Sequence, residues 1–144
     1  MDNTLHYLLM ADHLILQRLL TKAIKDTELT SGQPKVLDYL YSHDGAIQKD
    51  IAQNCCIEQA TLTSVLAGME NKGLIERRMM NGNRRNLYVF LTDKGKELTE
   101  RVEQEFLRLE EAAFAGLDEH EKELAIRFLS RIKDNLEHIT EESE

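Results

Sequence analysis

The feature that most constrains the fold of this chain is a change in hydrophobic period, from 3.6 to 2, just after Gly73. Before Gly73, apolar side chains recur every three or four residues, as in amphipathic helices. After it, residues 74–80 and 86–91 alternate as strands do, and Asn81-Gly82 between them suits the positive φ angles of a type I′ turn. The sequence therefore predicts one β-hairpin inside an otherwise helical chain.

Helices are expected on both sides of this hairpin, over residues 5–25, 30–42, 47–54, 58–72, 92–113 and 118–141. Thr30 with Gln33, and Asp118 with Glu121, have the spacing of capping boxes. In the second helix we expect the buried face to consist of Val36, Leu37, Leu40 and Tyr41. The helices over 47–54 and 58–72 are joined by a tight break, which makes them a helix-turn-helix candidate.

Length and composition favour a single globular domain over residues 1–144. The chain has 144 residues, of which 42% are hydrophobic, and this is enough to form one buried core. No apolar run approaches the roughly 18 residues of a membrane span, and Met1 to Thr4 lacks the basic start of a signal peptide. We therefore expect a soluble, cytoplasmic protein that binds no membrane.

The distribution of charge points to an anionic partner even though the net charge is −8. Residues 72–101 carry eight Lys or Arg against four Asp or Glu, whereas both flanking regions are acidic. Four of these basic residues surround the expected hairpin: Arg77, Arg78, Arg84 and Arg85. Such a basic island indicates that one element contacts nucleic acid while the rest of the chain stays solvated.

No pattern of residues indicates catalysis, a cofactor or a metal. Carboxylates are frequent but occur in runs without a nucleophile or a phosphate-binding loop, so we expect no enzymatic activity. His6 and His13 would lie about 10.5 Å apart along a helix, too far to share a metal ion. Cys55 and Cys56 are adjacent, which disfavours a disulfide between them. We expect Cys55 to be a small buried residue and Cys56 to be the better redox candidate.

A helix-turn-helix followed by a basic hairpin and framed by long terminal helices resembles the MarR family of bacterial transcription regulators. The motifs that carry the resemblance are Leu29-Thr30 with Gln33, Gln48-Lys49-Asp50-Ile51-Ala52, Thr61-Leu62-Thr63, Met69 to Arg77, Asn83-Arg84-Arg85-Asn86 and Leu91-Thr92-Asp93-Lys94-Gly95. The resemblance implies a mainly α (α+β) fold: a winged helix over about residues 30–95, with dimerisation helices over about 5–25 and 96–141.

The resemblance also implies a function. It is that of a homodimeric regulator, more often a repressor, that binds pseudo-palindromic double-stranded DNA and is released by a small-molecule effector. The expected DNA-binding residues are Gln59, Thr61, Thr63, Ser64, Gly68, Asn83, Arg84 and Arg85. For the effector, amphipathic aromatic side chains near the terminal helices are the candidates: Tyr7, His13, Tyr39 and Tyr41. Zinc-sensing members of the family are not matched, and no cofactor is implied.

Three positions depart from the family pattern. Ser64 and Gly68 stand where relatives often carry Arg, and Asn83 stands where they often carry Asp. Without these arginines the helix lacks the side chain best suited to bidentate contact with guanine. Two alternatives stay open: Thr61 and Thr63 are ordinary surface residues, and the hairpin arginines are a solvated edge that limits strand pairing. The alternative function is a helical dimer that binds a ligand or a protein and has lost specific DNA recognition.

Overall fold

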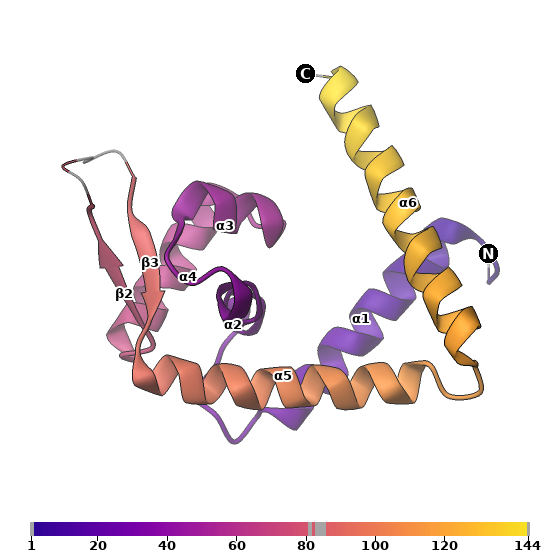
Figure 1. Cartoon of the computed structure of the whole chain (residues 1–144), viewed down its shortest axis with the longest axis horizontal. Helices are drawn as coiled ribbons and strands as arrows, with labels where there is room; N and C mark the ends of the chain where they lie inside the picture. The colour runs from indigo at the N-terminus through magenta and orange to yellow at the C-terminus, as the bar shows by residue number, and fades with distance from the viewer. Residues whose placement is uncertain (1, 81, 83–85, 144) are drawn as a thin grey trace. The chain divides into compact units, whose positions relative to one another are not determined.

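The computed structural model describes residues 2–80, 82 and 86–143 (Figure 1). The chain divides into two compact units, one ending at Leu109 and one beginning at Glu110. The first unit contains α-helices and a small sheet, and the second contains the end of one helix and a further long helix. That residues 1–144 act as one domain stays a prediction.

The centre of the first unit is a three-helix core formed by α2 (Gln33–Ser42), α3 (Gln48–Asn54) and α4 (Gln59–Asn71). Each helix directs its apolar stripe inward, and the fully buried side chains include Val36, Leu37, Leu40, Ile51, Leu62, Leu66 and Met69. Burying one such side chain contributes about 1.5–3 kcal/mol. The expected helix-turn-helix is confirmed, with α3 and α4 separated by a short turn.

Two details of α2 differ from the sequence prediction. The helix begins at Gln33 with Gly32 as its N-cap, and Gln33 Oε1 accepts a hydrogen bond from the Thr30 N–H at 3.0 Å, which is only half of the predicted capping box. The expectation that Tyr41 is buried is wrong, because its side chain is 60% exposed. Tyr41 lies about 90° around the helix from the centre of the stripe formed by residues 33, 36, 37 and 40.

The predicted hairpin belongs to a three-stranded antiparallel sheet in the order β1-β3-β2. The strands are β1 (Ala46–Ile47), β2 (Ile75–Arg78) and β3 (Tyr88–Leu91), with Ile75 opposite Leu91 and Arg78 opposite Tyr88. β2 and β3 are shorter than expected, and β1 was not predicted because two residues show no period. Gly82 has the expected positive φ, 67°, whereas Asn81 lies outside the described residues.

A pair of glycines fixes how α4 leads into the hairpin and how the hairpin leads into α5 (Asp93–Ala113). Gly73, at φ 72°, follows the last turn of α4, where the Leu74 N–H donates to Met69 O at 3.0 Å. Gly95 lies against the base of β2, where a Cβ atom would collide with the carbonyl oxygen of Leu74. The hairpin is therefore held at its base by both neighbouring helices.

The first helix, α1 (Leu5–Ala23), is joined to the rest of the first unit at its C-terminal end. Leu20, Ile24 and Leu109 form a second buried cluster. Arg101 Nη2 of α5 also donates to Asp26 Oδ1 at 2.9 Å and to Ala23 O at 3.1 Å. On other sides of α1, by contrast, apolar side chains such as Leu8, Leu16 and Leu19 are more than 40% exposed.

The second unit contains α6 (Glu119–Ser143), and its start confirms the second predicted capping box. The Asp118 N–H donates to Glu121 Oε1 at 3.0 Å, and the Glu121 N–H donates to Asp118 Oδ1 at 2.8 Å. Over residues 119–143 the helix has no buried residue, although Phe128, Leu129 and Ile139 belong to its apolar stripe. None of the helices that the structure describes is long and apolar enough to cross a membrane.

Candidate nucleic-acid interface

The exposed face of α4 carries short polar side chains. Gln59, Thr61, Thr63 and Ser64 are all exposed, on the sides of the helix away from Leu62, Leu66 and Met69. Thr63 Oγ1 donates to Gln59 O at 3.0 Å, which leaves its lone pairs available to accept a further hydrogen bond. Four of the predicted DNA-binding residues are thus brought together on one solvent-facing helix, as base contacts in a major groove require.

Gly68, predicted to belong to the same set, lies one turn after Ser64 on the same side of α4 but is less exposed. It is partly buried, and a Cβ atom there would lie 3.1 Å from Nε2 of Gln33, the first residue of α2. A side chain at this position would require the Gln33 amide to shift slightly. The glycine is therefore explained by packing between α4 and α2, and we do not include Gly68 among the proposed DNA contacts.

The turn between α3 and α4 depends on a left-handed residue, Cys56, at φ 54°. The turn is closed by backbone hydrogen bonds, including one from the Ile57 N–H to Ala52 O at 2.9 Å. Cys55 is buried, as expected, and burial raises the pKa of its thiol to about 11, so this thiol stays protonated at neutral pH. Cys56 is exposed, and its redox role stays a prediction.

Much of the basic island has hydrogen-bond or ion-pair partners inside the first unit. Arg77 Nε forms an ion pair with Glu70 Oε2 at 3.0 Å, and this contact lowers the pKa of the Glu70 carboxyl. Arg78 pairs with Glu76 and stacks 4.5 Å from the centre of the Phe90 ring. Lys72, Lys94 and Arg101 also have partners within the unit. Charge counting alone could not separate these structural cations from cations available to DNA.

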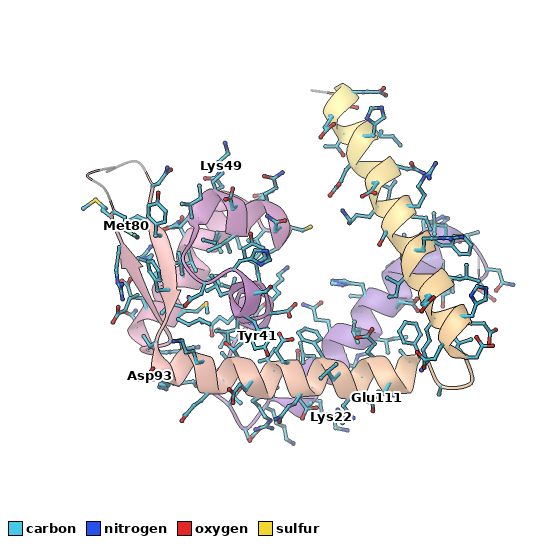
Figure 2. The ribbon with its side chains drawn as sticks, in the orientation of Figure 1. Lys22, Tyr41, Lys49, Met80, Asp93 and Glu111 are labelled. Atoms are coloured by element: carbon cyan, nitrogen blue, oxygen red, sulfur yellow. The ribbon has the colours of Figure 1, made fainter. Side chains whose placement is uncertain are left out.

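The remaining predicted wing residues, Asn83, Arg84 and Arg85, lie outside the described residues. On either side of them the hairpin strands are in place, with Met80 following β2 and Tyr88 opening β3 (Figure 2). The prediction that these three residues contact DNA therefore remains a prediction.

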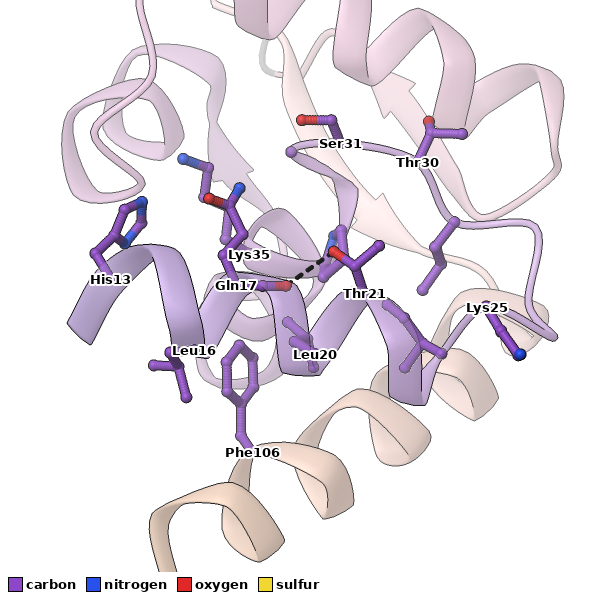
Figure 3. Close-up of a pocket in the computed structure, with 14 residues that line it drawn as sticks. His13, Leu16, Gln17, Leu20, Thr21, Lys25, Thr30, Ser31, Lys35 and Phe106 are labelled. Carbon is purple, nitrogen blue, oxygen red and sulfur yellow. Dashed lines mark hydrogen bonds between the residues drawn. The ribbon is translucent and has the colours of Figure 1, made fainter. Parts of the chain in front are cut away.

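A second candidate site is a cavity of about 460 Å³ in the first unit, between α1, the start of α2 and α5 (Figure 3). Its lining is largely apolar, from Leu16, Leu20, Ile24, Leu29 and Phe106, with Lys25 and Lys35 as the charged contributors. The other lining residues are His13, Gln17, Thr21, Thr30, Ser31, Gly32 and Pro34. A cavity of this size and composition suits a small amphipathic molecule, and the lysines favour one that carries negative charge.

Of the four predicted effector residues, only His13 lines this cavity. Tyr39 instead stacks on His43 with ring centres 4.3 Å apart, and its hydroxyl accepts a hydrogen bond from Asn54. Tyr41 is exposed, and Tyr7 lies about 9 Å before His13 along α1. That the tyrosines bind an effector stays a prediction, because they were selected as aromatic residues and do not line this cavity. The sequence feature that points to this cavity is the three-and-four spacing of residues 13, 16, 17, 20, 21 and 24 along α1 and its C-cap. These residues lie opposite the Leu29–Lys35 segment.

Metal ligands do not cluster in the described part of the chain: no group of three or more His, Cys, Asp or Glu side chains could hold an ion there.

Comparison with known proteins identifies the family. The MarR family matches residues 29–87, which span α2 to the hairpin. The HTH-type transcriptional regulator YdgJ of Bacillus subtilis is 30% identical over 113 residues, covering 78% of this chain and 69% of YdgJ. The chain belongs to the MarR family.

Other relatives and solved structures match most of the chain. The homoprotocatechuate degradative operon repressor of Escherichia coli is 26% identical over 119 residues, covering 83% of this chain and 73% of the repressor. The crystal structure of the S. aureus MepR–DNA complex is 29% identical, with a TM-score of 0.80, and covers 92% of this chain and 98% of MepR. The protein is thus a transcriptional regulator with a winged helix-turn-helix fold.

Proposed function

We propose that this MarR-family regulator is a homodimeric repressor that binds a pseudo-palindromic operator and is released by a small molecule. The observation that carries the proposal is the exposed polar surface of α4, which carries Gln59, Thr61, Thr63 and Ser64. These side chains would contact base edges in the major groove, and the segment with Arg84 and Arg85 would reach the adjacent minor groove. The relatives support this proposal, since MepR is known in complex with DNA and another relative is an operon repressor.

Dimerisation is supported by apolar side chains that a single chain leaves exposed. Leu8, Leu16 and Leu19 of α1 and Phe128 and Leu129 of α6 are each more than 40% exposed. A second copy related by a two-fold axis would cover these faces. It would also place two α4 helices about 34 Å apart, as two successive major grooves require.

The cavity beside α1 is the proposed effector site. A bound molecule would favour one arrangement of the dimer if it binds that arrangement more tightly. Release of DNA then requires no chemical change in the effector, so we propose that the protein has no enzymatic activity and needs no cofactor.

A band-shift titration with the DNA upstream of the protein's own gene tests the proposal. We expect Thr63→Ala to weaken binding to this DNA by about 5-fold or more, with little change on a scrambled duplex, because a base contact contributes about 1–3 kcal/mol of discrimination. Thr140→Ala is the matched control, since Thr140 is an exposed helical threonine that donates to its own i−4 carbonyl oxygen in the same way. Equal affinity of the parent for both duplexes would support the alternative module without specific DNA recognition.

A further inference from the structure

Gln33 is one of two polar residues that the described part of the chain buries, with 3% of its surface exposed. Its side-chain oxygen accepts two hydrogen bonds, from the Thr30 N–H at 3.0 Å and from Lys72 Nζ at 2.8 Å. A buried amide without partners is costly. Gln33 is therefore stable in this position only while both the loop before α2 and Lys72 stay in place.

Lys72 is the C-cap of α4, the candidate recognition helix. Its backbone N–H donates to Gly68 O at 3.1 Å, and its ammonium group donates to Glu28 O at 2.6 Å as well as to Gln33. Hydrogen bonds from a charged donor are stronger than neutral ones, and a cation is favourable at a helix C-terminus. Lys72 thus fastens the end of α4 to residues 28–33, which we call the 28–33 segment.

The 28–33 segment also packs closely along α4. A Cβ atom on Gly32 would lie 3.1 Å from Val65 Cγ2, and one on Gly68 would lie 3.1 Å from Gln33 Nε2. Closely packed elements pass a displacement on to each other because there is no space to absorb it. A movement of this segment would therefore move α4 as well.

The opposite side of the same segment forms a wall of the cavity. Leu29, Thr30, Ser31 and Gly32 all line it. Figure 3 shows Thr30 and Ser31 on the loop that runs beside α1. The segment thus separates the cavity from the recognition helix, and it contacts both.

We propose that Gln33 and Lys72 are positioning residues that transmit occupancy of the cavity to α4. A molecule that displaces the 28–33 segment would alter the bonds to Lys72 and shift the C-terminal end of the helix. The inference deepens the proposed function, on which it rests, by naming the residues that connect effector to DNA. It also assigns Lys72, one of the cations of the basic island, to regulation instead of to phosphate contact.

A covalent probe tests this inference without knowledge of the natural effector. In full-length protein carrying Cys56→Ser and Gln17→Cys, N-phenylmaleimide attaches a phenyl ring to a residue that lines the cavity, and mass spectrometry verifies the attachment. The buried Cys55 thiol, with its raised pKa, is left unmodified. We expect the attached ring to lower the affinity for operator DNA at least tenfold.

Comparing DNA affinity with and without the attached ring in three further variants shows which residues transmit the effect of the ring to α4. With Lys72→Met the effect of the ring should fall below twofold, whereas Gln33→Glu should keep it, because a carboxylate still accepts both hydrogen bonds. Lys96→Met is the matched control, since it removes the same charge from an exposed position of the basic island and should keep the tenfold effect. A tenfold effect that persists in Lys72→Met would overturn the inference, as would a verified label without effect in the parent.

Hydrogen exchange on the same samples without DNA separates this inference from the proposed function. The attached ring should speed exchange of the Lys72 and Gly73 amides in the parent, whereas Lys96→Met without the ring should leave their exchange unchanged. Faster exchange together with an absence of specific DNA binding would show that the proposed function is wrong and that the transmission stands. Unchanged exchange in the labelled parent would contradict the transmission.

Discussion

α4 and α1 are both amphipathic helices, but they differ in how much of the apolar stripe is buried within the chain. α4 buries Leu62, Leu66 and Met69 completely within its own chain, whereas α1 buries Leu20 and leaves Leu16 and Leu19 more than 40% exposed. The apolar residues recur with a similar period in the two helices. This period therefore cannot distinguish a stripe that packs inside the unit from one that packs against a second chain. The comparison separates interactions that determine the fold from interactions that require a partner.

The largest expected effect comes from shortening a side chain on the buried stripe of α4. Leu66→Ala should lower the free energy of unfolding by about 2–5 kcal/mol, because it leaves a cavity in a core with no exposed surface at that position. Urea unfolding followed by circular dichroism measures this. The difference in unfolding free energy between the variant and the parent should be the same at every protein concentration. A decrease below about 1 kcal/mol would show that α4 is not held as the structure indicates.

The exposed stripe of α1 should respond differently. Leu19→Asp should weaken dimerisation by about 100-fold, equivalent to about 2.7 kcal/mol, because it places a charge in an apolar interface. Sedimentation at several concentrations measures the dissociation constant, and Asp12→Ala, at another exposed position of α1, is the control. A parent that sediments as a monomer at micromolar concentration would contradict the dimer itself.

Two arginines of the hairpin offer the same contrast between a contact inside the unit and a contact with a partner. Arg77 is bound to Glu70 within its own unit, whereas Arg85 is predicted to contact DNA. Arg85→Ala should weaken DNA binding and reduce the slope of log affinity against log salt by about one unit for each phosphate that the side chain neutralises. Arg77→Ala should leave the slope unchanged and lower stability by about 0.2–1 kcal/mol, the range for an exposed ion pair. Equal slopes in the parent and both variants would make Arg85 part of a solvated edge.

The sequence was sufficient for the fold wherever local chemistry decides it. Gly73 ends α4 at a positive φ, Asp118 and Glu121 form their capping box, and the interior of the helix-turn-helix follows the apolar period. It was insufficient where a residue's role depends on a distant neighbour. Nothing local shows that Gly68 faces Gln33, or that Lys72 binds Glu28, 44 residues away. The sequence thus identified four exposed polar residues of α4, whereas of the predicted effector residues only His13 lines the cavity; the DNA and effector contacts themselves stay predictions.

The smallest expected effect distinguishes two carboxyl groups by their surroundings. The pKa of Glu70 is lowered by its hydrogen bond to Arg77, whereas burial and the neighbouring Asp38 raise the pKa of Glu103 to about 7. Because the folded state favours protonated Glu103, its contribution to stability is fully present below about pH 4.5 and disappears as the pH rises through 7. Glu103→Gln keeps a neutral side chain at every pH.

The difference in unfolding free energy between Glu103→Gln and the parent should therefore grow in favour of the variant from pH 5 to pH 8. Glu97→Gln, at an exposed position on the same helix, is the control and should show no such trend. Urea titrations at pH 5, 6.5 and 8 measure the difference. A parallel pH dependence of all three proteins would mean that Glu103 ionises as freely in the folded chain as in the unfolded one, and that the contact between α5 and the Asp38 carboxyl is looser than the structure shows.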